Sequence, residues 1–244
     1  MRELGLWCSS SMVALESGEP VAVLLGAKRD EATLVYALRV HPGHRRLGHG
    51  RHLLSSLGQK LAILGPPRLV AEVPADRAPA VALFESCRWR REGRLVDWRR
   101  QPEAFDGAAV AGAELAVGPV TVEEAAAAGL LRGGRSWHRE RATLDTRADR
   151  LEGLGFCSPE RLEAFLFHRQ AEGRCEIVAL GLADGALGRP ALRALVAELA
   201  RRSGGETLRL PRVAPEELAP GLLAELGFAP EGERLLFATE AQAA

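Results

Sequence analysis

The sequence predicts a mixed α/β protein built from two related halves, and three observations support this fold class. Short apolar runs of strand length alternate with segments whose apolar residues recur at helical spacing. Residues 12–98 follow the order strand, strand, strand, helix, strand, helix, strand. A shift of 139 residues then aligns 69–98 with 208–237 without a gap. Such self-similarity indicates a tandem repeat of one fold.

The elements of the first half follow from local patterns. The apolar runs 12–16 and 20–27 flank Ser17-Gly18-Glu19, which predicts a β-hairpin. Residues 32–40, rich in Leu and Val, predict a third strand. Residues 50–64 have the 3.6-residue apolar period of an amphipathic helix, which Gly65-Pro66-Pro67 ends. The remaining elements are a strand over 69–73, a helix over 79–86 and a strand over 95–98.

The second half begins after residues 101–113, which lack periodicity and predict a linker. We expect strands over 114–117, 162–170 and 175–182, and helices over 122–131, 137–144, 146–151 and 190–202. The early helices have no counterpart in the first half, which offers only residues 4–11 at that place.

Composition indicates an ordinary globular protein, with 47% hydrophobic and 26% charged residues. No apolar run reaches the roughly 20 residues of a membrane span, and residues 1–12 lack a secretory pattern, so we expect a cytoplasmic protein without membrane contact. The cysteines Cys8, Cys87, Cys157 and Cys175 are scattered and form no Cys-x-x-Cys motif. They predict reduced thiols rather than a disulfide framework.

The net charge is zero but unevenly divided. Residues 1–105 hold 16 basic and 11 acidic residues, whereas 106–244 hold 16 and 21. A basic first half suits an anionic ligand, although solvated faces alone could produce the same split. The Arg-rich run 88–100 is interrupted by acidic residues, so nucleic acid is not an expected partner.

The most informative stretch is 40–54, where a strand ends at Val40 and a helix begins near Arg51. Gly48 and Gly50 let the backbone approach a ligand closely, and a helix N-terminus presents unpaired N–H groups to an anion. The loop therefore predicts a cradle for a pyrophosphate. Arg45, Gly48 and Gly50 have the Arg-x-x-Gly-x-Gly spacing, which resembles the acyl-CoA-binding motif of the GNAT N-acetyltransferase family.

This resemblance, strong over 12–98 and weak over 113–238, implies two tandem GNAT-like domains in an acyl-CoA N-acyltransferase fold. The first would span 1–105, with an intact acetyl-CoA loop. The second would span 106–244 and be a degenerate copy, because Gly185-x-x-Gly188-x-Pro190 replaces the motif and Pro190 has no N–H. The second domain, or another subunit in a homodimer, is then expected to cover the acceptor side.

The resemblance also implies where acetyl-CoA binds and how it reacts. The strand ending at Val40 would splay from its neighbour, and an amine would attack the thioester directly while a strand N–H stabilises the oxyanion. Arg45 and Arg46 would add charge-assisted phosphate contacts. The residues expected to bind the thioester, pantetheine and pyrophosphate are Leu38, Arg39, Val40, Arg45, Arg46, Leu47, Gly48, His49, Gly50 and Arg51.

Two departures from the family pattern concern catalysis. In 80–89 the family's pattern places a general-acid Tyr where this chain has Phe84, and Gly where it has Arg88. The one tyrosine, Tyr36, lies on an earlier strand. No base is obvious either; Glu72, on the strand expected to flank the cleft, is the candidate, with His41 behind it and a surface carboxylate as the alternative.

Other interpretations of the loop are weaker. Gly43-x-x-x-x-Gly48 lacks the Lys and Ser/Thr of a Walker motif. The histidines His41, His44, His49 and His52 could suggest a metal site, but no carboxylate or Cys lies between them in sequence, so no metal is expected. The sequence thus predicts an acetyl-CoA-dependent N-acetyltransferase acting on a small-molecule or peptide amine. The alternative is a catalytically inactive CoA-binding or structural protein of the same fold.

Overall fold

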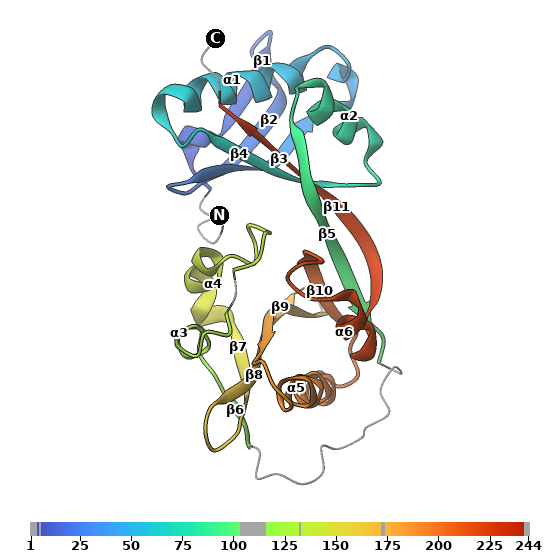
Figure 1. Ribbon diagram of the computed structural model, residues 1–244. Coiled ribbons are helices and arrows are strands. Elements are labelled where there is room, and N and C mark those ends of the chain that lie inside the picture. The colour runs from blue at the N-terminus through green and yellow to red at the C-terminus, as the bar shows by residue number, and fades with distance from the viewer. Residues whose placement is uncertain (1–3, 5, 103–115, 132, 172–173, 242–244) are drawn as a thin grey trace. The chain divides into compact units, whose positions relative to one another are not determined.

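The computed structural model describes residues 4, 6–102, 116–131, 133–171 and 174–241 (Figure 1). These residues divide into two compact units, one of 1–94 with 233–244 and one of 95–232. Both units are mixed α/β, as the sequence predicts. Most of the expected linker, 103–113, lies outside the described residues.

The first unit begins with three antiparallel strands, β1 (Met12–Glu16), β2 (Glu19–Lys28) and β3 (Ala32–Val40). The helix α1 (His49–Leu64) then leads to β4 (Arg68–Pro74), which is parallel to β3, and α2 (Ala78–Ser86) follows. The bounds of these six elements match the predicted ones within three residues. The expected closing strand is longer than 95–98, because β5 covers Arg90–Arg100.

The core of the first unit lies between one face of this sheet and its two helices. Leu53, Leu54, Leu57 and Leu61 recur along one side of α1 and pack on apolar residues of β2, β3 and β4. Phe84 of α2 joins the same cluster. No α-helix among the described residues of this unit packs on the opposite face of the sheet.

In the second unit, β6 (Ala116–Pro119) is followed by α3 (Val122–Ala127) and α4 (Arg141–Arg147). A meander of β7 (Glu152–Cys157), β8 (Leu162–Ala171) and β9 (Arg174–Leu182) comes next. The helix α5 (Gly188–Arg202) leads to β10 (Leu208–Val213), parallel to β9, and the last elements are α6 (Pro220–Glu225) and β11 (Ala229–Glu240).

Helices cover both faces of the second unit's sheet. Leu166 of β8 belongs to the cluster under α5, whereas its neighbours Phe165 and Phe167 belong to the cluster that includes residues of α3 and α4. This alternation is the period of two expected of a strand buried on both faces. The helices that the first half lacks are therefore present here between β6 and β7.

The predicted helices of this region were partly wrong. The helix expected over 122–131 ends at Ala127, because Gly129 takes a positive φ of 71°. The helices expected over 137–144 and 146–151 are a single α4 followed by a 3₁₀ turn at Ala148–Arg150. Trp137 is buried and its carbonyl accepts a hydrogen bond from Thr143 Oγ1, which holds 137–140 outside the helix.

The two halves of the sequence exchange their last strands. The Leu95–Arg100 part of β5 lies in the second unit, where it pairs antiparallel with β10. The Glu233–Glu240 part of β11 lies in the first unit, where it pairs antiparallel with β4 from Arg234↔Pro74 to Glu240↔Arg68. Phe237 is fully buried there and stacks on Phe84 at 5.5 Å between ring centroids. Each compact unit is therefore completed by a strand from the other half of the sequence.

Candidate active site

The first feature of the site is the separation of β3 from β4. Their parallel pairing is limited to Ala32↔Arg68, Thr33↔Leu69 and Leu34↔Val70. Further along, Leu38, Arg39 and Val40 pair with β2 on the other side. The end of β3 thus presents an edge toward β4 that has no strand partner among the described residues. A chain-like ligand can hydrogen-bond to such an edge as an added strand does.

The second feature is the loop from His41 to Gly48. Two of its residues have left-handed backbone, Arg46 with φ 66° and Gly48 with φ 90°. Gly48 is the N-cap of α1, and a Cβ built there meets nothing within 4 Å. The space beside this glycine is therefore open, while its backbone conformation is one that L side chains rarely adopt.

The loop and the first turn of α1 concentrate unpaired backbone donors. The first helical hydrogen bond runs from His52 N–H to the carbonyl of Gly48. The N–H groups of the six residues before it, 46–51, have no backbone acceptor among the described residues. Four of these donors, 48–51, belong to the start of α1 and two to the loop before it. Such donors suit an anion, because the helix dipole and the N–H groups favour the same charge, and residues 46–51 are called the cradle below.

The cationic side chains around this cradle are exposed. Arg45, Arg46 and Arg51 make no ion pair with any described residue. Arg45 Nε donates a weak hydrogen bond of 3.4 Å to the carbonyl of Val40. Leu47, between them, is 64% exposed. These guanidinium groups are available to an incoming phosphate.

Gly50 has a packing role that differs from that of Gly48. It is buried, and a Cβ there would lie 3.0 Å from Cδ2 of Leu83. The missing side chain lets the first turn of α1 approach α2 closely. The two glycines of the motif therefore serve different purposes, one at the turn and one at the helix contact.

The catalytic candidates occupy distinct environments. Glu72 is half-buried on β4 and alternates with Leu69, Ala71 and Val73, which face the core under α1; its side chain therefore lies on the opposite face of the sheet. Phe84, at the position of the family's general acid, is 4% exposed, with Trp89 edge-on at 5.0 Å. Tyr36 of β3 is 43% exposed.

The corresponding loop of the second unit is built differently. Its helix α5 has N-cap Leu187 in the right-handed region, and Pro190 has no N–H to donate. A Cβ on Gly188 would lie 2.1 Å from the carbonyl oxygen of Ala183, so this glycine is closed against backbone. Arg161 Nη2, from outside this loop, donates to the carbonyl of Asp184 in the loop. The parallel strands β9 and β10 nevertheless separate after Arg209↔Glu176, as β3 and β4 do.

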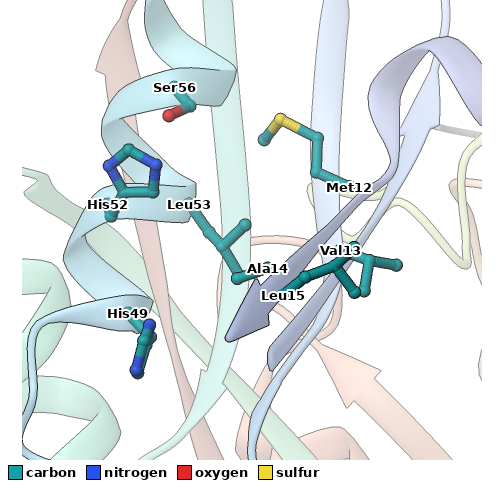
Figure 2. Close-up of a pocket in the computed structure, with 8 residues that line it drawn as sticks. All are labelled: Met12, Val13, Ala14, Leu15, His49, His52, Leu53 and Ser56. Carbon is teal, nitrogen blue, oxygen red and sulfur yellow. The ribbon is translucent and has the colours of Figure 1, made fainter. Parts of the chain in front are cut away.

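A pocket of about 490 Å³ lies in the first unit between β1 and the first turns of α1 (Figure 2). In Figure 2, His49 and His52 extend from successive turns of α1 beside Met12 and Leu15 of β1. Glu16, at the end of β1, contacts both His44 and His49. The sequence patterns did not single out this residue. The one sequence feature that could have drawn attention to Glu16 is its position directly before the predicted hairpin turn.

Comparisons with known proteins decide the family. Residues 2–88 match the family described as the acetyltransferase (GNAT) family. A mycothiol acetyltransferase of Kineococcus radiotolerans is 31% identical over 207 residues, which cover 78% of this chain and 67% of that relative. The chain belongs to the GNAT acetyltransferase family.

Solved structures of GNAT proteins share its fold. A GCN5-related N-acetyltransferase from Sphaerobacter thermophilus matches with a TM-score of 0.71 at 17% identity, covering 95% of this chain and 81% of the other. A tandem GNAT protein from the clavulanic acid biosynthesis pathway also matches with a TM-score of 0.71, at 18% identity, covering 96% and 83%. The predicted fold class, tandem GNAT-like α/β, is thereby confirmed. Among the described residues, no helix has the length and apolarity to span a bilayer.

Proposed function

We propose that this GNAT protein is an N-acetyltransferase that uses acetyl-CoA and acts on the amine of a small molecule or peptide. The observation that carries the proposal is the cradle of six backbone N–H groups at 46–51, beside the unpaired edge of β3. The cradle suits a pyrophosphate, and the edge suits the amide-bearing chain that leads from it to a thioester. Arg45 and Arg46 would add contacts to the phosphates.

The proposed reaction is a direct transfer. The acceptor's neutral nitrogen attacks the thioester carbonyl, so that a C–N bond forms and the C–S bond breaks. A backbone N–H at Leu38–Val40 stabilises the developing oxyanion. The amine loses a proton, for which Glu72 is the candidate acceptor through water, and the thiolate of CoA leaves. Because Phe84 has no hydroxyl, we propose that solvent rather than a side chain protonates the thiolate.

We further propose that the first domain of the sequence, 1–105, carries the acetyl-CoA site and that 106–244 is a degenerate copy. The closed backbone around Gly188 and the missing donor at Pro190 support this division. The relative named as a mycothiol acetyltransferase favours a small-molecule acceptor, and deacetylated mycothiol is a sensible first member of an acceptor panel.

A second function is favoured by one specific observation. Phe84 fills the core at the family's general-acid position, which suits a protein that binds CoA without catalysis. Loss of a general acid costs about 10²–10⁴ in rate, so a slow enzyme is the other consequence of the same residue. Thiol release from acetyl-CoA with a panel of amines, beside calorimetric binding of CoA, separates the two. Binding without turnover on any amine favours the inactive protein.

The cradle is tested by Gly48→Glu, which introduces a negative charge and a strained backbone at its centre. We expect acetyl-CoA affinity to fall at least about tenfold, because the carboxylate repels the phosphates and a φ of 90° disfavours the loop conformation that presents the N–H groups. Gly58→Ala is the matched control, since Gly58 lies on the same helix in open space at ordinary φ. Equal affinity of the Gly48→Glu variant and the parent, measured by calorimetry, would contradict the proposed site.

A further inference from the structure

Two histidines of the cradle region, His44 and His49, meet a carboxylate that is distant from them in sequence, Glu16. Glu16 ends β1, His44 lies in the 3₁₀ turn Pro42–His44, and His49 is the first residue of α1. Glu16 Oε2 lies 2.8 Å from His44 Nδ1 and 3.6 Å from His49 Nε2. One donor atom from each of the three lies within 4.8 Å of the others. The fold thus supplies the carboxylate that the histidine-rich loop lacks in sequence.

These distances suit a shared metal ion. With ligand bonds of about 2.0–2.1 Å at tetrahedral angles, two donor atoms lie roughly 3.3 Å apart. The separations of Glu16 from His44 and from His49 lie on either side of this value, and the donor atoms of the two histidines lie within 4.8 Å of each other. The side chains would have to rotate for all three atoms to bind one ion. The three side chains keep between one fifth and one half of their surface exposed. Glu16 and His44 are thus open to an ion from solution, whereas His49 is the most covered of the three.

An ordinary hydrogen bond accounts for only part of the cluster. The His44–Glu16 contact is a normal hydrogen bond in length. His49 Nε2, however, is a buried nitrogen without a hydrogen-bond partner, and its 3.6 Å approach to Glu16 Oε2 is too long for one. When the imidazole is neutral, such a nitrogen has a lone pair that no hydrogen bond to a described residue engages, and a metal ion can accept it.

We propose that Glu16, His44 and His49 form a binding site for one divalent transition-metal ion of the zinc class. Two imidazoles and one carboxylate suit Zn²⁺ or Co²⁺ better than Mg²⁺ or Ca²⁺, which prefer oxygen ligands. Three protein ligands leave the fourth position to solvent. The ion would tie the end of β1 to the loop and the first turn of α1. The site does not depend on the proposed acetyl transfer.

The test is a titration of the tag-free, metal-depleted full chain with Co²⁺ and with Zn²⁺. We expect one ion per chain, visible d–d absorption of tetrahedral Co²⁺, and loss of that absorption when Zn²⁺ replaces it. Glu16→Gln, His44→Ala and His49→Ala should each weaken binding at least about tenfold, because each removes one ligand. Glu19→Gln on β2 and His52→Ala on α1 are matched controls outside the cluster and should bind as the parent does.

A second measurement avoids substitution altogether. In the unmodified chain, Zn²⁺ should shift the imidazole NMR signals of His44 and His49 and leave those of His138 and His168 in place. The proposal is overturned if the parent shows no saturable one-to-one binding. It is equally overturned if the His49→Ala variant retains the parent's Co²⁺ spectrum and affinity, or if Zn²⁺ shifts other histidines instead. Thermal unfolding of each variant verifies that its fold is intact.

Discussion

At the scale of single residues, left-handed backbone marks both the cradle and the ends of two equivalent helices. Arg88 follows α2 with φ 61°, and Gly227 follows α6 with φ 79°. The two positions are 139 residues apart, which is the shift that aligns the halves. Trp89 N–H donates to the carbonyl of Phe84, and Phe228 N–H donates to that of Leu223, so both helices end in the same motif.

This equivalence predicts opposite effects of two substitutions. Arg88→Gly should raise the free energy of unfolding by about 1 kcal/mol, because glycine adopts positive φ without the Cβ clash of an L side chain. Gly227→Ala should lower it by a similar amount for the same reason. Urea unfolding of both variants measures the two changes.

The control for these variants is Arg90→Gly, two residues further along in β5. Arg90 is the first residue of that strand and has no positive φ, so glycine relieves no strain there and this variant should gain nothing. If Arg88→Gly were no more stable than Arg90→Gly, the left-handed strain assigned to Arg88 would be wrong.

At the scale of elements, periodicity predicted the first half well. The bounds of β3 and α1 came from an apolar run and a 3.6-residue period that no tertiary contact overrides. The strand β7, in contrast, was missed because it contains Gly153 and Gly155, which weaken strand propensity. Gly153 is needed there, since a Cβ would lie 1.8 Å from the carbonyl oxygen of Val120. A tertiary contact of this kind has no local sequence signal.

The site shows the same division. The cradle residues 46–51 are contiguous, so a local sequence motif reveals them. Glu16 is not contiguous with them, and its contact with His44 depends on how β1 pairs with β2 beside the loop. The pairing of β11 with β4 was not predicted for the same reason, because a local pattern identifies a strand but not the strand with which it pairs. The roles of Leu38–Val40 and Glu72 in catalysis stay predictions.

The helix α5 offers a prediction about pH. Glu198 accepts hydrogen bonds from Arg201 and Arg202 near its C-terminal end, and these bonds lower the pKa of the Glu198 carboxyl to about 2. A depressed pKa in the folded state stabilises the fold above the unfolded value of about 4.5. That contribution is lost as the pH falls from there toward 2.

Glu198→Gln should therefore be less stable than the parent at pH 7 by under about 1 kcal/mol, since both arginines are largely exposed. The difference should shrink toward zero near pH 2 and also decrease with added salt. Denaturant unfolding of the two proteins across this range measures it. A stability difference that does not change with pH would show that lost packing, rather than lost ion pairs, destabilises the Glu198→Gln variant.

At the scale of the whole molecule, the exchanged strands make each compact unit depend on both halves of the sequence. The first unit's sheet includes β11, and Phe237 fills its core against Phe84. The second unit's core includes Phe228, only nine residues earlier in the chain. Two phenylalanines that are close in the sequence thus belong to different compact units.

Substituting these two residues tests the exchange. Phe237→Ala should cost about 3–5 kcal/mol of stability, because it empties a fully buried aromatic site. Amide exchange should then rise in β2–β4 and α1. Phe228→Ala should cost a similar amount but raise exchange in β8–β10 and α5. Mass spectrometry measures the amide exchange of each peptide. The reverse pattern would contradict the assignment of Phe237 to the first unit and Phe228 to the second.

The exchange of strands between the two halves of the sequence also predicts how fragments behave. A chain of residues 1–105 lacks β11, so β4 has an unpaired edge and the pocket for Phe237 is empty; it should not fold into a stable unit. A separate peptide of residues 229–244 should restore cooperative unfolding and binding of acetyl-CoA, whereas the same peptide with Phe237→Ala should not. Stable folding of 1–105 alone would show that β5, rather than β11, can complete this sheet, and the two units would then be independent copies of one domain.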